Sequence, residues 1–357
     1  MVTELSIGIT AEVIKMFSLG ALAFIISVLL TPALTHFLYK YKLWQKREKE
    51  KSIDGANLRV ISKFHQGKGT HTPRLGGLLI WVVPLVMIFV FFLLSKTGYG
   101  FFEKMNFLSR GETWLPLFAL IIASLLGLVD DLSQIFGKGK YVGGGLSLSK
   151  RILIIVLIGL IGGLWFYFKL DVETIHIPGN GDFNIGWWYI LLFIIVMLGT
   201  YSGGVIDGLD GLAGGSFATF FTAFAIIAIF QGQINLATFC FVLVGAILAF
   251  LWFNIPPARF YMGETGVMGL CATLAVVAFL TDSVFVLPII AFPLVVESGS
   301  CILQLLSKKI RKKKIFLAAP IHHHFEAKGW PAYKVTMRFW VIGLVAALIG
   351  VAIRLLG

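Results

Sequence analysis

Two carboxylates, Asp207 and Asp210, lie in a glycine-rich stretch between two apolar runs that are each long enough to cross a lipid bilayer. An ionised carboxylate beside lipid is costly, and those that occur usually face a polar cavity or a cation. A spacing of three residues places both acids on one face of a helix, and neighbouring glycines such as Gly208 let a ligand approach the backbone. The stretch is a candidate site for a cation or a polar ligand, although a short exposed turn between two helices fits the same residues.

A second pair of acids, Asp130 and Asp131, ends the apolar run LLGLVDD. Adjacent residues on a helix point about 100° apart, so both side chains can reach one ligand from different directions. Carboxylates are disfavoured at a helix C-terminus, because that end of the helix dipole is negative. The plain alternative is a solvated pair of acids, but a divalent cation would offset the charge. Magnesium suits this role because it binds carboxylate oxygens together with substrate phosphates.

Further polar residues lie in the segments that separate the apolar runs. The sequence NIPPARFYMGETG contains three of them and APIHHHFEAKGWP contains three consecutive histidines: Asn254, Tyr261, Glu264, His322, His323 and His324. Three adjacent histidines in a loop rarely all face one metal ion, so we expect this segment to recognise a phosphate or a sugar. Tyr261 could stack on a nucleotide base, although an aromatic residue near the membrane interface is more often an anchor.

Basic residues of the same segments could bind phosphate oxygens. Lys68, Arg74, Lys138 and Arg151 supply charge that complements a phosphate. For any single lysine, the general excess of basic residues on one side of a membrane is the simpler explanation. Gln304 lies inside an apolar run and needs a polar partner, so we expect it to face the protein interior.

The composition indicates which elements position these residues. Of the 357 residues, 58% are hydrophobic and 13% are charged, and long apolar stretches of this kind form transmembrane helices. We predict an all-α polytopic membrane protein with about ten transmembrane helices and no separate soluble domain, so that residues 1–357 form a single integral membrane domain. The predicted spans are 14–39, 75–95, 113–130, 152–168, 184–202, 211–230, 235–253, 266–282, 284–306 and 335–356.

Basic residues are distributed unevenly between the two sides of the predicted bundle. The segments that follow the odd-numbered spans hold 24 of the 30 Lys and Arg residues. Because a basic excess marks the cytoplasmic side, we expect these segments to face the cytoplasm and both termini to lie outside. Both acid pairs, the NIPPARF segment and the histidines belong to these same segments. We therefore predict one cytoplasmic active site at the membrane boundary.

The chain resembles the polyprenyl-phosphate N-acetylhexosamine-1-phosphate transferases in five motifs, taken in order. They are HQGKGTHTPRLGG, LVDD, VIDGLDGLAGG, FLWFNIPPARFYMGETG and APIHHHFEAKGWP. The last motif is similar to that of the branch that uses UDP-N-acetylmuramoyl-pentapeptide. The resemblance implies Mg²⁺-dependent transfer of the phospho-sugar to undecaprenyl phosphate at the cytoplasmic face of the bacterial inner membrane. The products would be lipid I, for peptidoglycan synthesis, and UMP.

The resemblance also implies roles for individual residues. It makes Glu264 and Asp131 metal ligands, and Asp130, Asp131 and Asp207 catalytic acids. The substrate-binding positions that it implies are Lys68, Arg74, Lys138, Arg151, Gly208, Asp210, Asn254, Tyr261, Gln304, His322, His323 and His324.

Four residues depart from the pattern of that family. Glu264 stands where Asp is usual, Gln134 replaces a lysine, Gly204 replaces an asparagine and Arg74 replaces a threonine. Glu264 keeps the negative charge on a longer side chain, so a metal could still bind with altered geometry. Arg74, in the sequence PRLGG, is closer to the relatives that transfer N-acetylglucosamine phosphate.

Two other functions fit part of the pattern. Arg74 favours a related transferase that uses UDP-N-acetylglucosamine, whereas the three histidines oppose it. An ion-coupled transporter would hold acids near the bilayer midplane, often within inverted repeats, but these acids lie at span ends on one side and we find no repeat. The net charge of +12 requires no nucleic-acid partner, because anionic membrane lipid and phosphorylated substrates account for it. The oligomeric state stays open, a homodimer included.

Overall fold

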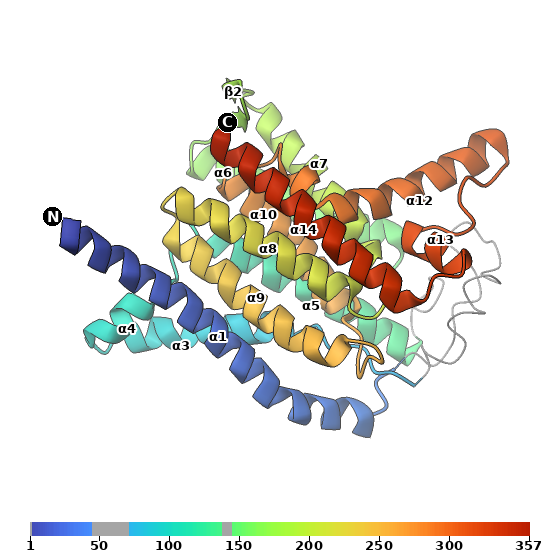
Figure 1. Cartoon of the computed structure of the whole chain (residues 1–357), viewed down its shortest axis with the longest axis horizontal. Coiled ribbons are helices and arrows are strands. Elements are labelled where there is room, and N and C mark those ends of the chain that lie inside the picture. The colour runs from blue at the N-terminus through green and yellow to red at the C-terminus, as the bar shows by residue number, and fades with distance from the viewer. Residues whose placement is uncertain (1, 45–70, 138–144) are drawn as a thin grey trace.

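The structure is a computed structural model that describes residues 2–44, 71–137 and 145–357 (Figure 1). Nine helices in these residues are long and apolar enough to cross a membrane. They are α1 (Val2–Lys40), α3 (Leu78–Ser95), α5 (Trp114–Phe136), α6 (Leu148–Lys169), α7 (Trp188–Ser202) with the short 3-10 helix η1 (Gly203–Ile206), α8 (Leu212–Phe230), α9 (Ile234–Asn254), α10 (Gly263–Leu280) and α14 (Ala332–Leu356). The predicted all-α polytopic class is confirmed. Lys68 and Lys138 lie outside the described residues.

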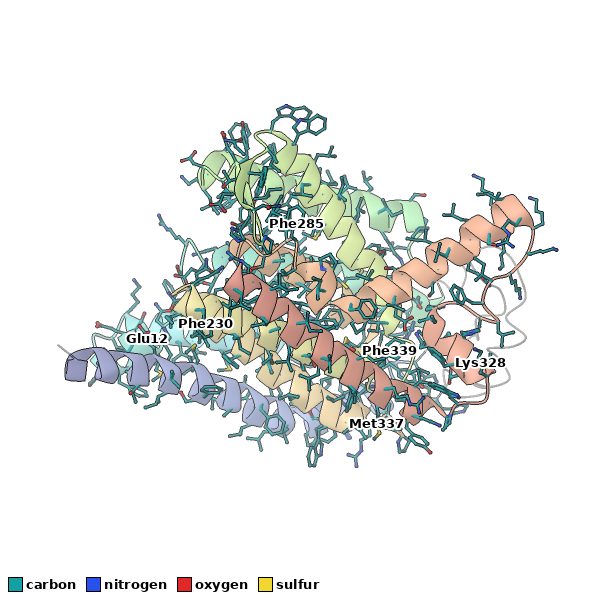
Figure 2. The ribbon with its side chains drawn as sticks, turned by 45° about the horizontal axis from the view of Figure 1, so that its top comes forward. Glu12, Phe230, Phe285, Lys328, Met337 and Phe339 are labelled. Carbon is teal, nitrogen blue, oxygen red and sulfur yellow. The ribbon has the colours of Figure 1, made fainter. Side chains whose placement is uncertain are left out.

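Helices α8, α9 and α10 form the centre of the bundle. In their most apolar stretches 78%, 78% and 89% of the residues are buried inside the protein, against 28% in both α1 and α14. The central helices are apolar on all sides, as expected of helices that other helices surround. α1 lies beside α9, and α14 lies beside α8 (Figure 1). The outer helices keep an exposed apolar side for lipid: Met337 on α14, labelled in Figure 2, is 58% exposed.

The span predicted over residues 284–306 is two helices instead of one. α11 (Leu287–Ile290) ends before Ala291, and α12 (Phe292–Arg311) begins directly after it. Pro293 lies in the first turn of α12, where its missing N–H is tolerated. A proline inside a continuous helix removes one backbone hydrogen bond and its ring clashes with the carbonyl four residues earlier, so a helix start just before Pro293 avoids that cost. The expectation of a single helix is wrong for this segment, and α12 points away from the bundle (Figure 1).

The two ends of the bundle carry different short elements. The chain termini lie toward one end, together with α4 (Gly100–Met105) and the antiparallel hairpin of β1 (Thr174–Ile177) and β2 (Gly181–Asn184) (Figure 1). α13 (Ile321–Ala327), which holds the three histidines, lies toward the other end. The polar motifs of the sequence therefore belong to the end of the bundle that is far from the termini.

Helices α5 and α10 approach each other closely beside the acids. A Cβ atom placed on Gly127 of α5 would lie 2.1 Å from the carbonyl oxygen of Glu264, at the start of α10. Non-bonded atoms do not approach so closely, so this glycine permits the observed separation of the two helices.

The variant Gly127→Ala should therefore disturb the fold and the site together. We expect its methyl group to push α5 away from α10 and to cost about 1–3 kcal/mol of stability, as overpacking of an interior usually does. Activity should fall as well, because Asp131 and Glu264 lie on the two displaced helices. Thermal unfolding in detergent and initial rates would measure both effects. Gly199→Ala is the matched control, because no atom lies within 4 Å of a Cβ there. An unchanged melting temperature in Gly127→Ala would contradict the close approach.

Candidate active site

The N-terminus of α10 gathers carboxylates from three separate parts of the chain. Asp131, near the end of α5, accepts a hydrogen bond from the Thr265 N–H at 2.9 Å. Asp207, directly after η1, accepts a hydrogen bond from the Gly263 N–H. Glu264 is itself in the first turn of α10. The first N–H groups of a helix have no partner within the helix and carry the positive end of its dipole, so carboxylates are stabilised at this place.

Backbone pairing brings the PRLGG motif to the same place. Tyr261 donates its N–H to the carbonyl of Pro73 and accepts the N–H of Gly76, each at 2.9 Å. These bonds tie the loop before α3 to the loop before α10, and they place Arg74 next to the acids. The Tyr261 hydroxyl hydrogen-bonds Thr72, and burial raises the pKa of Tyr261 above its ordinary value. The stacking of Tyr261 on a base stays a prediction.

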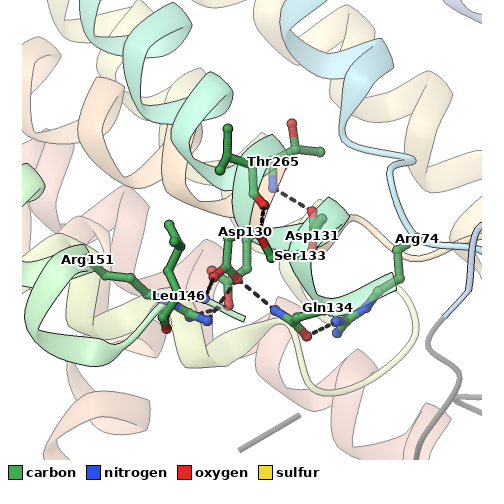
Figure 3. Close-up of polar contacts among 10 residues, drawn as sticks. Arg74, Asp130, Asp131, Ser133, Gln134, Leu146, Arg151 and Thr265 are labelled. Atoms are coloured by element: carbon green, nitrogen blue, oxygen red, sulfur yellow. Dashed lines mark hydrogen bonds and ion pairs between the residues drawn. The ribbon is translucent and has the colours of Figure 1, made fainter. Parts of the chain in front are cut away.

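Arg151 joins two of the acids, Asp130 and Glu264, in a largely buried ion-pair network, and Figure 3 shows its contact with Asp130. Its guanidinium lies 2.8 Å from Asp130 and 3.0 Å from Glu264, and 11% of its side chain is exposed. Asp130 is fully buried, and it also accepts hydrogen bonds from the Leu146 N–H at 2.6 Å and from the Gln134 side chain at 2.7 Å. Buried charges are tolerated when they are paired and hydrogen-bonded in this way. Asp130 therefore organises its neighbours, whereas Glu264 is 29% exposed and can reach a ligand.

The remaining acids are candidate ligands for a divalent cation, and binding of a cation by them stays a prediction. Asp131 is fully buried, and its Oδ1 atom has no hydrogen-bond partner among the described residues. Burial raises the pKa of Asp207 to about 7, although nearby Arg74 lowers it; the adjacent Glu264 carboxylate raises it further. A cation beside these groups would stabilise their ionised forms. Carboxylate oxygens are the hard donors that Mg²⁺ prefers. Among the described residues, the acids and histidines whose ligand atoms all lie within 4.8 Å of one another are His176, Asp182 and Asp282. Asp131, Asp207 and Glu264 would therefore have to move closer together to share one ion.

Asp210 and Asn254 bind the backbone of neighbouring loops. Asn254 accepts the N–H of Gly211 and donates to the carbonyl of Phe260, both at 2.9 Å, and its side chain is buried. Asp210 accepts the N–H of Ala258 at 3.3 Å. These contacts fix the DGLDG loop against the loop after α9. Any contact of these two residues with a nucleotide remains a prediction.

His322 lies beneath the DGLDG loop. Its side chain is fully buried, and its Nδ1 atom lies 2.8 Å from a carboxylate oxygen of the equally buried Glu297. Its Nε2 atom faces Gly208, where a Cβ would lie only 2.2 Å away. Gly208 therefore leaves space for this imidazole, whereas the sequence suggested that it leaves space for a ligand. Glu297 orients the ring.

The other two histidines and Gln304 have separate partners. The Nδ1 atom of His323 lies 2.7 Å from the carboxylate of Glu326, and the ring of His324 accepts a backbone N–H from the loop before α13 at 3.1 Å. Gln304 satisfies both ends of its buried amide with the backbone of residues 315–316. The three histidines thus have different partners among the described residues.

Three residues of this region, Gln134, Glu297 and Trp340, are absent from the predicted set. Gln134 follows Asp130 by four residues, a spacing that places two helical side chains on one face. Glu297 is an acid inside an apolar run, which indicates a buried partner. Trp340 donates its indole N–H to the carbonyl of Gly211 at 3.2 Å, and no local pattern in the sequence indicates that contact.

Comparisons with known proteins show which proteins this chain is similar to. Residues 113–282 match the family described as glycosyl transferase family 4. A phospho-N-acetylmuramoyl-pentapeptide-transferase from Geobacillus sp. (strain WCH70) is 35% identical over 339 residues, which cover 93% of this chain and 96% of the relative. The protein of the same name from Listeria monocytogenes is 34% identical over 337 residues, with the same coverage. The one from Levilactobacillus brevis is 36% identical over 301 residues, which cover 84% of this chain and 89% of the relative.

The helical bundle and the family match together define a membrane-embedded glycosyl-type transferase. At this identity and coverage, the chain belongs to the phospho-N-acetylmuramoyl-pentapeptide-transferase family.

Proposed function

We propose that this protein transfers phospho-N-acetylmuramoyl-pentapeptide from UDP to undecaprenyl phosphate, which forms lipid I for peptidoglycan synthesis and releases UMP. The observation that carries the proposal is the gathering of Asp131, Asp207 and Glu264 at one helix N-terminus, with Arg74 and Arg151 beside them. Phosphoryl transfer requires this combination, because carboxylates hold a cation and arginines stabilise phosphate charge. The names of the relatives favour the muramoyl-pentapeptide substrate over N-acetylglucosamine.

Mg²⁺ is the proposed cofactor, held by Asp131 and Glu264 with Asp207 beside them. When bound, it would supply positive charge that polarises the phosphate oxygens. Arg151 orients Glu264 through their ion pair of 3.0 Å, and Arg74 adds a second cation next to the acids. These residues bind and align the diphosphate.

The lipid phosphate needs alignment more than it needs a strong base. A phosphate monoester has a second pKa of about 6, so it is largely ionised at neutral pH. We propose direct attack of its oxygen on the sugar-side phosphorus, with UMP leaving with the electron pair of the broken P–O bond. Asp130 is buried and bound by Arg151, Gln134 and a backbone N–H, which supports a positioning role over a covalent aspartyl intermediate. Ping-pong kinetics with a trappable phospho-sugar enzyme would contradict direct attack.

The proposed location of the site is the cytoplasmic face of the bacterial inner membrane. The basic excess of the segments that carry the site supports this orientation, since 24 of the 30 Lys and Arg residues belong to them. A UDP-linked donor, made in the cytoplasm, would reach the site from that side.

Release of UMP tests the proposed function. Purified protein should release UMP when it receives UDP-N-acetylmuramoyl-pentapeptide, undecaprenyl phosphate and Mg²⁺ together, and EDTA should stop the release. UDP-N-acetylglucosamine should react at least about 100-fold more slowly, because groups that bind the peptide would stay unpaired. Faster release from UDP-N-acetylglucosamine would identify the related transferase instead. Proton- or sodium-driven uptake into vesicles without UMP release would identify a transporter.

A further inference from the structure

Gln134 connects the two arginines of the site through a continuous chain of side chains (Figure 3). Its amide nitrogen donates to a carboxylate oxygen of Asp130 at 2.7 Å, and its carbonyl oxygen accepts a hydrogen bond from the Arg74 guanidinium. Asp130 in turn lies 2.8 Å from Arg151. Gln134 is buried, so both ends of its amide are used away from water.

The two arginines are held in different ways. Arg151 directs its guanidinium at two carboxylates, those of Asp130 and Glu264, which cancel much of its charge. Arg74 is half-buried, and its side-chain hydrogen-bond partner among the described residues is a neutral amide, while the nearby carboxylates of Asp131 and Asp207 interact with it electrostatically. The amide orients the guanidinium without adding a charge of its own. Arginine has five N–H donors, so the bond to Gln134 leaves donors that can bind phosphate oxygens.

Arg74 and Gln134 are also two of the four departures from the family pattern. They are 60 positions apart in the chain and yet in direct contact. A lysine at position 134 would place a second cation against Arg74, which is unfavourable. The two departures therefore belong together: this chain has its positive charge at Arg74, on the loop before α3, whereas the family pattern has it in a lysine at position 134, on α5.

We propose that Gln134 is a positioning residue that aims the Arg74 guanidinium at the diphosphate of the nucleotide sugar. This assignment rests on the proposed function, since it takes a UDP-sugar as the ligand. Arg74 makes the contact with phosphate, and Gln134 acts through Arg74. If Gln134 acts through Arg74, the effect of a lysine at position 134 on KM depends on whether Arg74 is present. If Gln134 only fills space, the effect is the same with or without Arg74.

The test is the effect of Gln134→Lys in two backgrounds. In the wild-type background, this substitution should raise KM for UDP-N-acetylmuramoyl-pentapeptide at least about 10-fold, because the new cation displaces Arg74. Arg74→Thr alone should raise KM about 10- to 100-fold, since a charge-assisted contact is lost. In the Arg74→Thr background, Gln134→Lys should instead lower KM about 10-fold, because the lysine returns the missing charge. In each case kcat should change less than KM.

Ser133→Ala is the matched control on the same helix turn. The Ser133 hydroxyl hydrogen-bonds the Val129 carbonyl of its own helix at 2.7 Å, and KM should stay at the wild-type value. Thermal unfolding of each variant reports whether it is folded. If Gln134→Lys does not fold, Gln134→Met replaces it in the test. Gln134→Met should raise KM when Arg74 is present and leave KM unchanged in the Arg74→Thr background, because Gln134 acts through the Arg74 guanidinium.

Titration calorimetry with the nucleotide sugar separates the two possible failures. A wild-type protein that neither binds the UDP-sugar nor releases UMP would show that the proposed function is wrong. The positioning role alone would be overturned if the wild-type protein does both but the Gln134 substitutions change KM equally in the two backgrounds.

Discussion

Replacement of Asp131 by asparagine should lower kcat at least about 1000-fold and leave the protein folded. The asparagine oxygen can still accept the Thr265 N–H, so the contact between α5 and α10 survives. The substitution removes the negative charge of a fully buried carboxylate whose Oδ1 atom has no partner among the described residues. Loss of one charged ligand removes several kcal/mol of cation binding, and each 1.36 kcal/mol corresponds to a factor of ten in rate.

The measurement is the initial rate of UMP release at saturating substrate, together with the melting temperature in detergent. Glu103→Gln is the matched control, because Glu103 is an exposed acid on α4, toward the opposite end of the bundle. The control should keep the wild-type rate. A rate of Asp131→Asn within about twofold of wild type would remove Asp131 from the metal site.

Replacement of Glu264 should have the second-largest effect. Glu264→Ala removes a proposed metal ligand and also leaves Arg151 with one carboxylate partner instead of two. We expect kcat to fall about 100- to 1000-fold, since both cation binding and the orientation of Arg151 are affected. Stability should fall by no more than about 1 kcal/mol, because the Glu264 side chain is partly exposed and the Arg151–Asp130 pair remains.

Glu264→Asp separates the two roles of this residue. Aspartate keeps the charge beside the metal site, but it is one methylene too short for the observed contact with Arg151 at 3.0 Å. Activity should therefore lie between those of the wild type and Glu264→Ala, about 10-fold below the wild type. Wild-type activity would show that the longer side chain has no function here. Activity as low as that of Glu264→Ala would show that the pocket depends on the length of glutamate.

The class of fold could be predicted from composition and periodicity alone. Apolar runs of sufficient length must be helices in lipid, and the structure has nine such helices in the residues that it describes. The break at Ala291 was not predicted, because the apolar run continues across it. Pro293 and the polar residues of α12 were present in the sequence, but a hydropathy pattern reports the length of an apolar run and not where a proline interrupts the helix.

The sequence could predict which acids share an end of the bundle, because alternate spans return the chain to the same side. It predicted one site for these acids, but it could not predict that the N-terminus of α10 is the place where Asp131 and Asp207 are bound. That meeting depends on the close approach of α5 and α10 at Gly127, a tertiary feature. The contact between Arg74 and Gln134 has the same origin, since it joins residues 60 positions apart.

The histidine segment shows a different limit. Its motif is similar to that of the branch that uses UDP-N-acetylmuramoyl-pentapeptide, and the resemblance implied substrate binding by all three rings. In the structure, His322 is buried between Glu297 and Gly208, and its contact with a substrate stays a prediction. Specificity of a motif identifies a family, but it does not separate residues that touch a ligand from residues that hold the loops around it.

The central claim is that Asp131 and Glu264, with Asp207 beside them, hold one divalent cation. Binding of Mn²⁺, a spectroscopically visible substitute for Mg²⁺ at carboxylate sites, tests it directly by electron paramagnetic resonance on the purified protein. We predict one tightly bound Mn²⁺ per chain in the wild type and in Glu103→Gln, and at least about 10-fold weaker binding in Asp131→Asn and in Glu264→Ala. Equal affinity for Mn²⁺ in all four proteins would contradict the claim.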